Sequence, residues 1–176
     1  MKRALAVAVL LLPVSVFAQA PAPQSAVATA AGTWEGNMKW ITMAADQMPE
    51  ADYAYKPVST VRSFGQLIGH IAGAQYMFCA IALGETAKGE GDIEKTVTSK
   101  AGLVAALKGS NDYCRRAYAM TDAQATGSVK LFDQDRSKLS VLMQNSTHIA
   151  EHYGNIVTYM RMKSMVPPSS QPQPGM

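Results

Sequence analysis

Histidine and cysteine are scarce in this 176-residue chain, which contains three histidines and two cysteines. Two cysteines cannot build a disulfide-dense scaffold. Charged residues make up only 16% of the sequence, 16 basic against 13 acidic, which excludes an electrostatic nucleic-acid binder. The apolar fraction of 48% excludes a disordered chain, and the length suits one domain with a real core.

Motifs for several common chemistries are also absent. The sequence has no Gly-rich phosphate loop, no C-x-x-C-H haem site and no nucleophile elbow for acyl transfer. Beyond the N-terminal segment, no apolar run reaches the ~18 residues that a membrane span needs, so we expect none in the mature chain. Of the eleven methionines, only Met162 and Met165 have the M-x-x-M spacing, and the lack of a longer cluster favours core packing over copper binding.

Residues 1–18 have the layout of a secretory signal peptide. Two basic residues precede an apolar run over 4–12, and cleavage after Ala18 or Ala20 satisfies the small-residue rule. We favour Ala18, because the later cut leaves Pro21 beside the cleavage point. The sequence therefore predicts export to the periplasm or out of the cell. Cleavage lowers the net charge from +3 to 14 minus 13, or +1, which says little about a partner.

The remaining chain divides into three parts. Residues 19–32 are rich in Pro, Ala and Ser without a packing pattern, so we expect a flexible tether. Residues 33–169 carry the folded domain, and residues 170–176 form a loose tail. One domain therefore carries whatever function the mature protein has.

Apolar residues at spacings of three and four predict four helices. The first begins at an N-cap, Thr33, and ends at Pro49. The second begins at a capping box formed by Ser63 and Gln66 and stops at Gly84.

The third helix follows a polar surface connection over 84–98. One of its faces carries Leu103, Leu107, Ser110, Cys114 and Ala117. A second connection, 120–134, leads to the longest helix, from about Asp135 to Lys163, and no β-alternation of useful length appears. Four such helices predict an all-α protein, a four-helix bundle.

Polar residues follow a row that adjoins the apolar seam of the last helix. The row comprises Val141, Asn145, His148, His152, Asn155 and Tyr159. His148 and His152 are one turn apart and can converge on one ion, and His70 borders the apolar stripe of the second helix. Three imidazoles from two helices would form a metal site with open positions for water or substrate. Histidines satisfied by hydrogen bonds in the core remain the alternative.

Residues 148–152 also match H-x-x-E-H, the inverted zinc-protease pattern, in which Glu151 would be the general base. That mechanism needs a further carboxylate ligand, and no aspartate or glutamate follows His152. We therefore expect Glu151 to be a solvated residue or an outer partner of the site.

Several segments together resemble the DinB-like superfamily, which is distinct from the DNA polymerase of similar name. They are Trp40, Met48-Pro49-Glu50, Tyr55-Lys56-Pro57, the run from Arg62 to His70, the run from His148 to Asn155, Tyr159-Met160-Arg161 and Val166-Pro167-Pro168-Ser169. The resemblance covers nearly all of the mature chain. One departure is Lys163-Ser164-Met165, where relatives often carry a glycine.

The resemblance implies a four-helix bundle with a long crossover between the second and third helices. It also implies a divalent metal, often zinc or nickel, on a histidine triad that maps onto His70, His148 and His152. Some relatives are metal-dependent thiol S-transferases or isomerases that use low-molecular-weight thiols, and many have no known reaction.

Cys79 and Cys114 are structural thiols, metal ligands or a disulfide pair. In a simple antiparallel hairpin the two would lie roughly 16 Å apart along the helix axes, too far to bridge. A parallel crossover brings both near C-terminal helix ends, and an oxidising compartment favours pairing. We therefore predict a Cys79–Cys114 disulfide.

The resulting hypothesis is an exported protein that binds a divalent metal and acts on a small molecule as a hydrolase or thiol transferase. Export weakens the transferase version, because cytosolic thiols are scarce outside the cell. The alternative is a non-catalytic bundle that binds metal or a small ligand. We expect no nucleic-acid partner, and the sequence does not decide whether the chain forms a homodimer.

Overall fold

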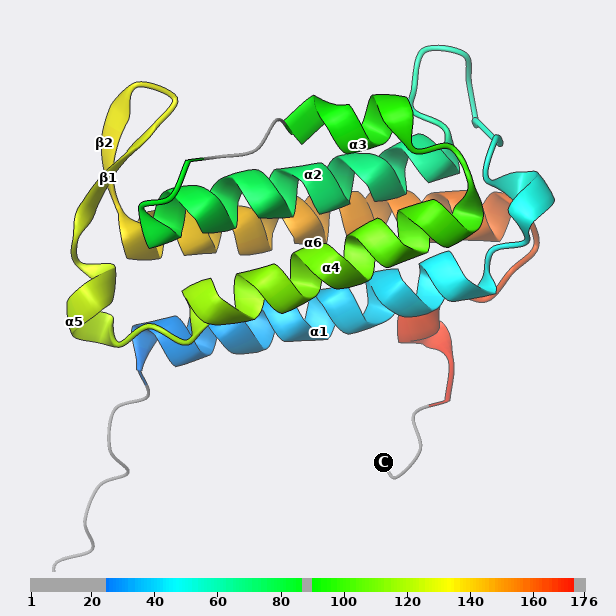
Figure 1. The fold of residues 1–176 in the computed structure, drawn as a ribbon. Coiled ribbons are helices and arrows are strands. Elements are labelled where there is room, and N and C mark those ends of the chain that lie inside the picture. Colours follow the sequence, from blue (N-terminus) through cyan, green and yellow to red (C-terminus); the bar gives the residue numbers. More distant parts are fainter. Residues whose placement is uncertain (1–24, 87–89, 173–176) are drawn as a thin grey trace, which may run out of the picture.

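Four long helices form a bundle in the computed structural model, which describes residues 25–86 and 90–172 (Figure 1). They are α1 (Ala26–Gln47), α2 (Phe64–Leu83), α4 (Lys100–Tyr118) and α6 (Lys138–Met162). Helix α2 packs between α4 and α6, and α1 closes the bundle against the same two helices. The prediction of an all-α four-helix bundle is confirmed. The predicted signal peptide lies outside the described residues.

Short elements fill the connections. They are η1 (Glu50–Asp52), α3 (Glu90–Thr96), α5 (Asp122–Ala125), β1 (Ser128–Leu131), β2 (Gln134–Ser137) and η2 (Pro168–Ser170). The segment over 84–98 is therefore more than a surface connection, because it contains α3, which packs along α2. The Ile93 and Val97 side chains of this segment are half-buried against the core.

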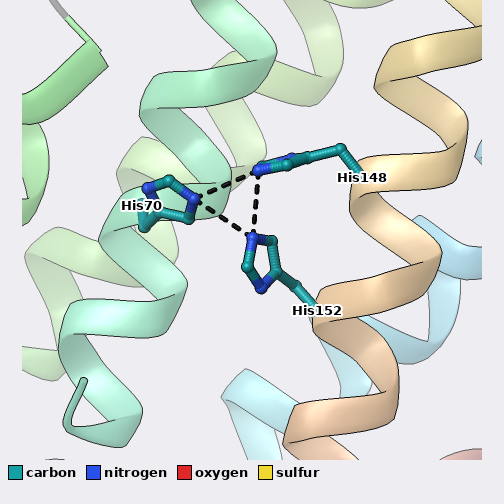
Figure 2. Close-up of side chains that lie close together, drawn as sticks. All are labelled: His70, His148 and His152. Atoms are coloured by element: carbon teal, nitrogen blue, oxygen red, sulfur yellow. Dashed lines mark hydrogen bonds between the residues drawn. The ribbon is translucent and has the colours of Figure 1, made fainter. Parts of the chain in front are cut away.

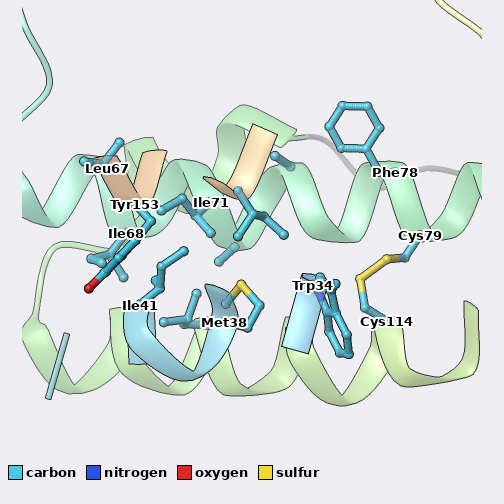
Figure 3. Close-up of a cluster of buried hydrophobic side chains, with 14 of the residues drawn as sticks. Trp34, Met38, Ile41, Leu67, Ile68, Ile71, Phe78, Cys79, Cys114 and Tyr153 are labelled. Atoms are coloured by element: carbon cyan, nitrogen blue, oxygen red, sulfur yellow. A yellow bond between two sulfur atoms is a disulfide. The ribbon is translucent and has the colours of Figure 1, made fainter. Parts of the chain in front are cut away.

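Helices α2 and α4 are parallel, because α3 carries the chain back along α2 before α4 begins (Figure 1). This arrangement confirms the predicted crossover. Cys79 and Cys114 form a disulfide with Cα atoms 5.3 Å apart, so the predicted pairing is confirmed (Figure 3). The alternatives of free thiols and of metal ligands are wrong.

Helix α1 begins at Ala26, so the tether prediction is wrong for residues 26–32 and Thr33 is not the N-cap. The cap residue is Ser25, whose hydroxyl accepts from the Ala28 N–H. The decisive partner is distant in sequence: Asp122 accepts from the backbone N–H of Val27 at 2.9 Å and of Ala26 at 3.1 Å. These bonds satisfy orphan donors of the first helical turn and lower the pKa of Asp122.

A β-hairpin precedes α6, where we expected a connection without strands. Strands β1 and β2 pair antiparallel around a two-residue turn, Phe132–Asp133, in which both residues have positive φ. Such a turn matches the twist of a hairpin, but its usual sequence is Asn-Gly or Asp-Gly. Consequently α6 starts at Lys138, three residues later than predicted, with Ser137 as its N-cap.

The predicted helix faces form the core (Figure 3). All five residues of the predicted third-helix face are buried, and the capping box of Ser63 and Gln66 starts α2. Gly84 ends α2 in the left-handed conformation, with φ of 77°. Helix α2 is also the one described helix long and apolar enough to cross a membrane; 67% of that stretch is buried in the bundle, as in a core helix.

A polar network crosses the core between α1, α2 and α4. The Gln75 side chain accepts from Trp34 Nε1 at 2.8 Å and donates to Ser110 Oγ and Asn111 Oδ1. Gln75 and Ser110 are fully buried. The amide thus explains why a serine occupies an otherwise apolar face of α4, and it fixes how α2 and α4 meet.

We expect Gln75→Leu to lower the free energy of unfolding by about 2 kcal/mol, because it leaves the buried Trp34 N–H without its acceptor. Urea denaturation followed by circular dichroism measures the effect. Gln144→Leu is the matched control. Gln144 is exposed on α6, so this substitution should change the free energy of unfolding by no more than about 0.5 kcal/mol. Equal effects of the two substitutions would contradict a role for the network.

Candidate metal centre

The three histidines come from two neighbouring helices of the bundle. His70 lies on α2, seven residues after the Ser63 cap, while His148 and His152 lie one turn apart on α6. His152 is buried, and the other two are half-buried. All three rings point into the space between α2 and α6 (Figure 2). The structure therefore brings together all three residues that the sequence singled out as metal ligands.

The Nε2 atoms of the three rings form a nearly equilateral triangle (Figure 2). The distance from His70 Nε2 to each of the other two is 3.1 Å, and His148 and His152 are separated by 3.0 Å. Two bonds of about 2.0–2.1 Å to one ion hold their nitrogens roughly 2.9 Å apart at right angles and roughly 3.3 Å apart at tetrahedral angles. The observed separations lie between these values, so the triangle fits a divalent metal.

Hydrogen bonds alone cannot satisfy this triangle. A ring nitrogen that carries a proton has no lone pair left to accept, so three nitrogens can share at most two hydrogen bonds. Burial, the largest cause, lowers the pKa of each of the three imidazoles to about 4, which keeps them neutral at pH 7. Neutral imidazole is the form that binds metal.

The second ring nitrogens have different surroundings. His70 Nδ1 lies 3.5 Å from Glu94 Oε2, and His152 Nδ1 lies 3.3 Å from the Asn155 amide nitrogen. His148 Nδ1 is buried without a hydrogen-bond partner among the described residues. His70 is thus the ring whose outer nitrogen faces a carboxylate.

A cavity of about 770 Å³ opens beside the histidines. Its walls come from the loop before α2, from α2, α3 and α6. The chemically active lining residues are Lys56, Arg62, Gln66, Glu94, Glu151, His152, Asn155 and Tyr159. The cavity is large enough for a small molecule, and it carries both charges as well as neutral donors.

Other polar residues of the α6 row divide into two groups. Asn145 is buried away from the cavity and donates to Tyr118 Oη at 3.2 Å, as a structural hydrogen-bonding partner. Tyr159 donates to the Arg62 carbonyl at 2.6 Å and lines the cavity. Glu151 is exposed on the cavity wall, which agrees with a solvated residue and not with a protease base on the histidines.

Glu94 is the residue near the site that sequence reasoning missed. It lies in α3, within the polar stretch interpreted as a surface connection. Its Oε1 accepts from Arg62 Nε at 3.0 Å while Oε2 faces His70. No local signal separates it from the other acidic residues of that stretch, because the packing of α3 on α2 brings it to the site.

Two comparisons with known proteins, a family model and solved structures, support the helical-bundle fold. The sequence model of the DinB superfamily matches residues 38–156. A DinB-like protein from Bacillus cereus superposes with a TM-score of 0.69 at 18% identity, covering 79% of this chain and 93% of its own. A DinB-like protein from Bacillus subtilis gives a TM-score of 0.56 at 19% identity, covering 82% and 99%. No curated protein matches the sequence.

Proposed function

Since the chain belongs to the DinB superfamily, we propose that it is an exported protein that binds one divalent metal, zinc or nickel, through His70, His148 and His152. The triangle of Nε2 atoms 3.0–3.1 Å apart is the observation that carries the metal-binding part of this proposal. Imidazole ligands suit both metals, and three protein ligands leave coordination positions open.

We further propose that the site acts on a small molecule in the adjoining cavity, as a hydrolase or thiol transferase. A bound metal would lower the pKa of water or of a thiol and so supply a nucleophile at neutral pH. The chain's own residues would hold the substrate: the Arg62 guanidinium offers donors to an anionic group, and Asn155 and Tyr159 add neutral polar contacts.

Export is supported by the N-terminal signal pattern and by the Cys79–Cys114 disulfide, since disulfides persist in oxidising compartments. N-terminal sequencing of the protein recovered from the exported fraction tests this part. The expected first residue is Gln19, and an intact Met1 in a cytosolic fraction would contradict export.

Turnover tests the catalytic part. The mature protein, loaded with one zinc per chain, is assayed on activated esters, amides, phosphoesters and epoxides, each with and without a low-molecular-weight thiol. We expect activity that disappears when a chelator strips the metal and returns when zinc is restored. Activity without thiol favours the hydrolase, and strict thiol dependence favours the transferase. Stoichiometric metal binding without any turnover favours the non-catalytic alternative.

A further inference from the structure

The crossover helix α3 contributes to the histidine site, although it carries none of the three histidines. Glu94 is the α3 residue concerned, and its two carboxylate oxygens have different partners. Oε1 accepts from Arg62 Nε at 3.0 Å, and Oε2 lies 3.5 Å from His70 Nδ1. The carboxylate therefore bridges the cavity wall and the outer nitrogen of one predicted ligand.

The position of Glu94 depends on a glycine of α2, Gly69, which is adjacent to His70. A Cβ atom at Gly69 would lie 2.9 Å from the Glu94 Cα, closer than real Cβ contacts, so any other residue here would push α3 outward. Gly69 directly precedes His70. The sequence thus places the smallest residue at the point where α3 must approach α2 for the Glu94 carboxylate to reach the His70 imidazole.

Fold stability gives little reason for this arrangement. The Arg62 side chain is 42% exposed, and ion pairs with that much solvent contact contribute little to stability. By contrast, an imidazole that binds metal through Nε2 carries its proton on Nδ1, and a carboxylate facing Nδ1 fixes that tautomer and the ring orientation.

We propose that Glu94 is a positioning residue for the metal site: it accepts a hydrogen bond from the His70 Nδ1–H and holds the Nε2 lone pair toward the other two histidines. The proposal rests on the proposed metal-binding function. The packing of α3 against α2 then becomes part of the site. A substitution at Gly69 would displace Glu94 and so weaken metal binding, although it changes none of the three histidines.

Zinc affinity, measured on the mature chain by competition with a chelator, tests the proposal. We expect Glu94→Ala to weaken zinc binding about 10–100-fold, the usual effect of losing an outer partner of a ligand. Glu94→Gln keeps an acceptor oxygen and should recover part of the loss. Asp92→Asn is the matched control, because it removes the same charge from an exposed side chain of the same helix.

The melting temperature of the metal-free protein separates positioning from stability. Without metal, we expect Glu94→Ala and Asp92→Asn to have the same melting temperature. When zinc is added, only Glu94→Ala should lose the rise in melting temperature that zinc gives the wild type. Gly69→Ala should weaken zinc binding as well, while Gly154→Ala, where a Cβ meets nothing within 4 Å, should not.

The outcomes are distinct. If the wild-type chain binds zinc and both Glu94 variants bind it as tightly as Asp92→Asn, the positioning role is wrong and the metal site stands. If the wild-type chain binds no divalent metal, the proposed function itself fails. A Gly69→Ala chain that does not fold leaves the decision to the two Glu94 variants.

Discussion

We expect the replacement of His152 by alanine to abolish stoichiometric metal binding. The substitution removes one corner of the Nε2 triangle and the most buried of the three rings. Loss of an outer hydrogen-bond partner already weakens metal affinity about 10–100-fold, and loss of a direct ligand exceeds that. Elemental analysis of purified mature protein provides the first measurement, with one metal per chain expected in the wild type and less than a tenth of that in the variant.

Thr147→Ala serves as the control for this experiment. The Thr147 side chain is exposed beside His148, and within the part of the chain that the structure describes it donates only to the Met143 carbonyl of its own helix. We expect full metal content in this variant. Added zinc should raise the melting temperature of the wild type and of Thr147→Ala but not of His152→Ala, because only a folded site that binds metal gains stability from it. Wild-type metal content in His152→Ala would refute the triad.

The second large effect concerns the disulfide between α2 and α4. Cys79 and Cys114 are 35 residues apart in sequence, and a cross-link that closes a loop of this length stabilises a fold by about 3–4 kcal/mol in the chain-entropy description. We expect the double substitution Cys79→Ala/Cys114→Ala to lower the free energy of unfolding by at least that amount. The urea midpoint, measured with and without reductant, reports it.

Reductant is the internal control for the disulfide. It should shift the wild-type midpoint and leave the double variant unchanged. Metal content should persist in the folded double variant, because the histidines depend on the packing of α2 against α6, whereas the disulfide joins α2 to α4. Two free thiols in denatured, unreduced wild-type protein would contradict the pairing.

The candidate site was largely predictable because its three residues obey helical spacing. His148 and His152 are four residues apart, which places them on one face of any helix, and His70 borders an apolar stripe that has to face the bundle. The scarcity of histidine sharpened the prediction, since no other imidazole competed for the role. Glu94 could not be found in this way, because its place follows from how α3 packs on α2.

The C-terminal end of α6 is a second feature whose conformation could not be predicted from the sequence. The resemblance implied a glycine within the segment Lys163-Ser164-Met165, which has none, and the structure places Ser164 in the left-handed conformation, with φ of 57°. Glycine adopts that conformation without steric cost, whereas serine does so at some expense. Tyr159, five residues earlier on α6, donates to the Arg62 carbonyl at 2.6 Å, so the left-handed residue lies beyond the part of α6 that lines the cavity.

By itself, the sequence determined the features that depend on neighbours a few residues apart. These are the periodic core faces, the Ser63–Gln66 capping box and the left-handed stop at Gly84, because helical geometry relates residues three and four apart directly. It also determined which histidines could share a site.

Only the tertiary structure decided the features that join distant segments. Asp122 starts α1 at Ala26 from 96 residues away, and Glu94 reaches His70 because Gly69 lets α3 approach. Backbone N–H groups at helix starts and imidazole N–H groups bond to the acceptors that tertiary packing places near them. A local sequence pattern does not show which acceptors these are.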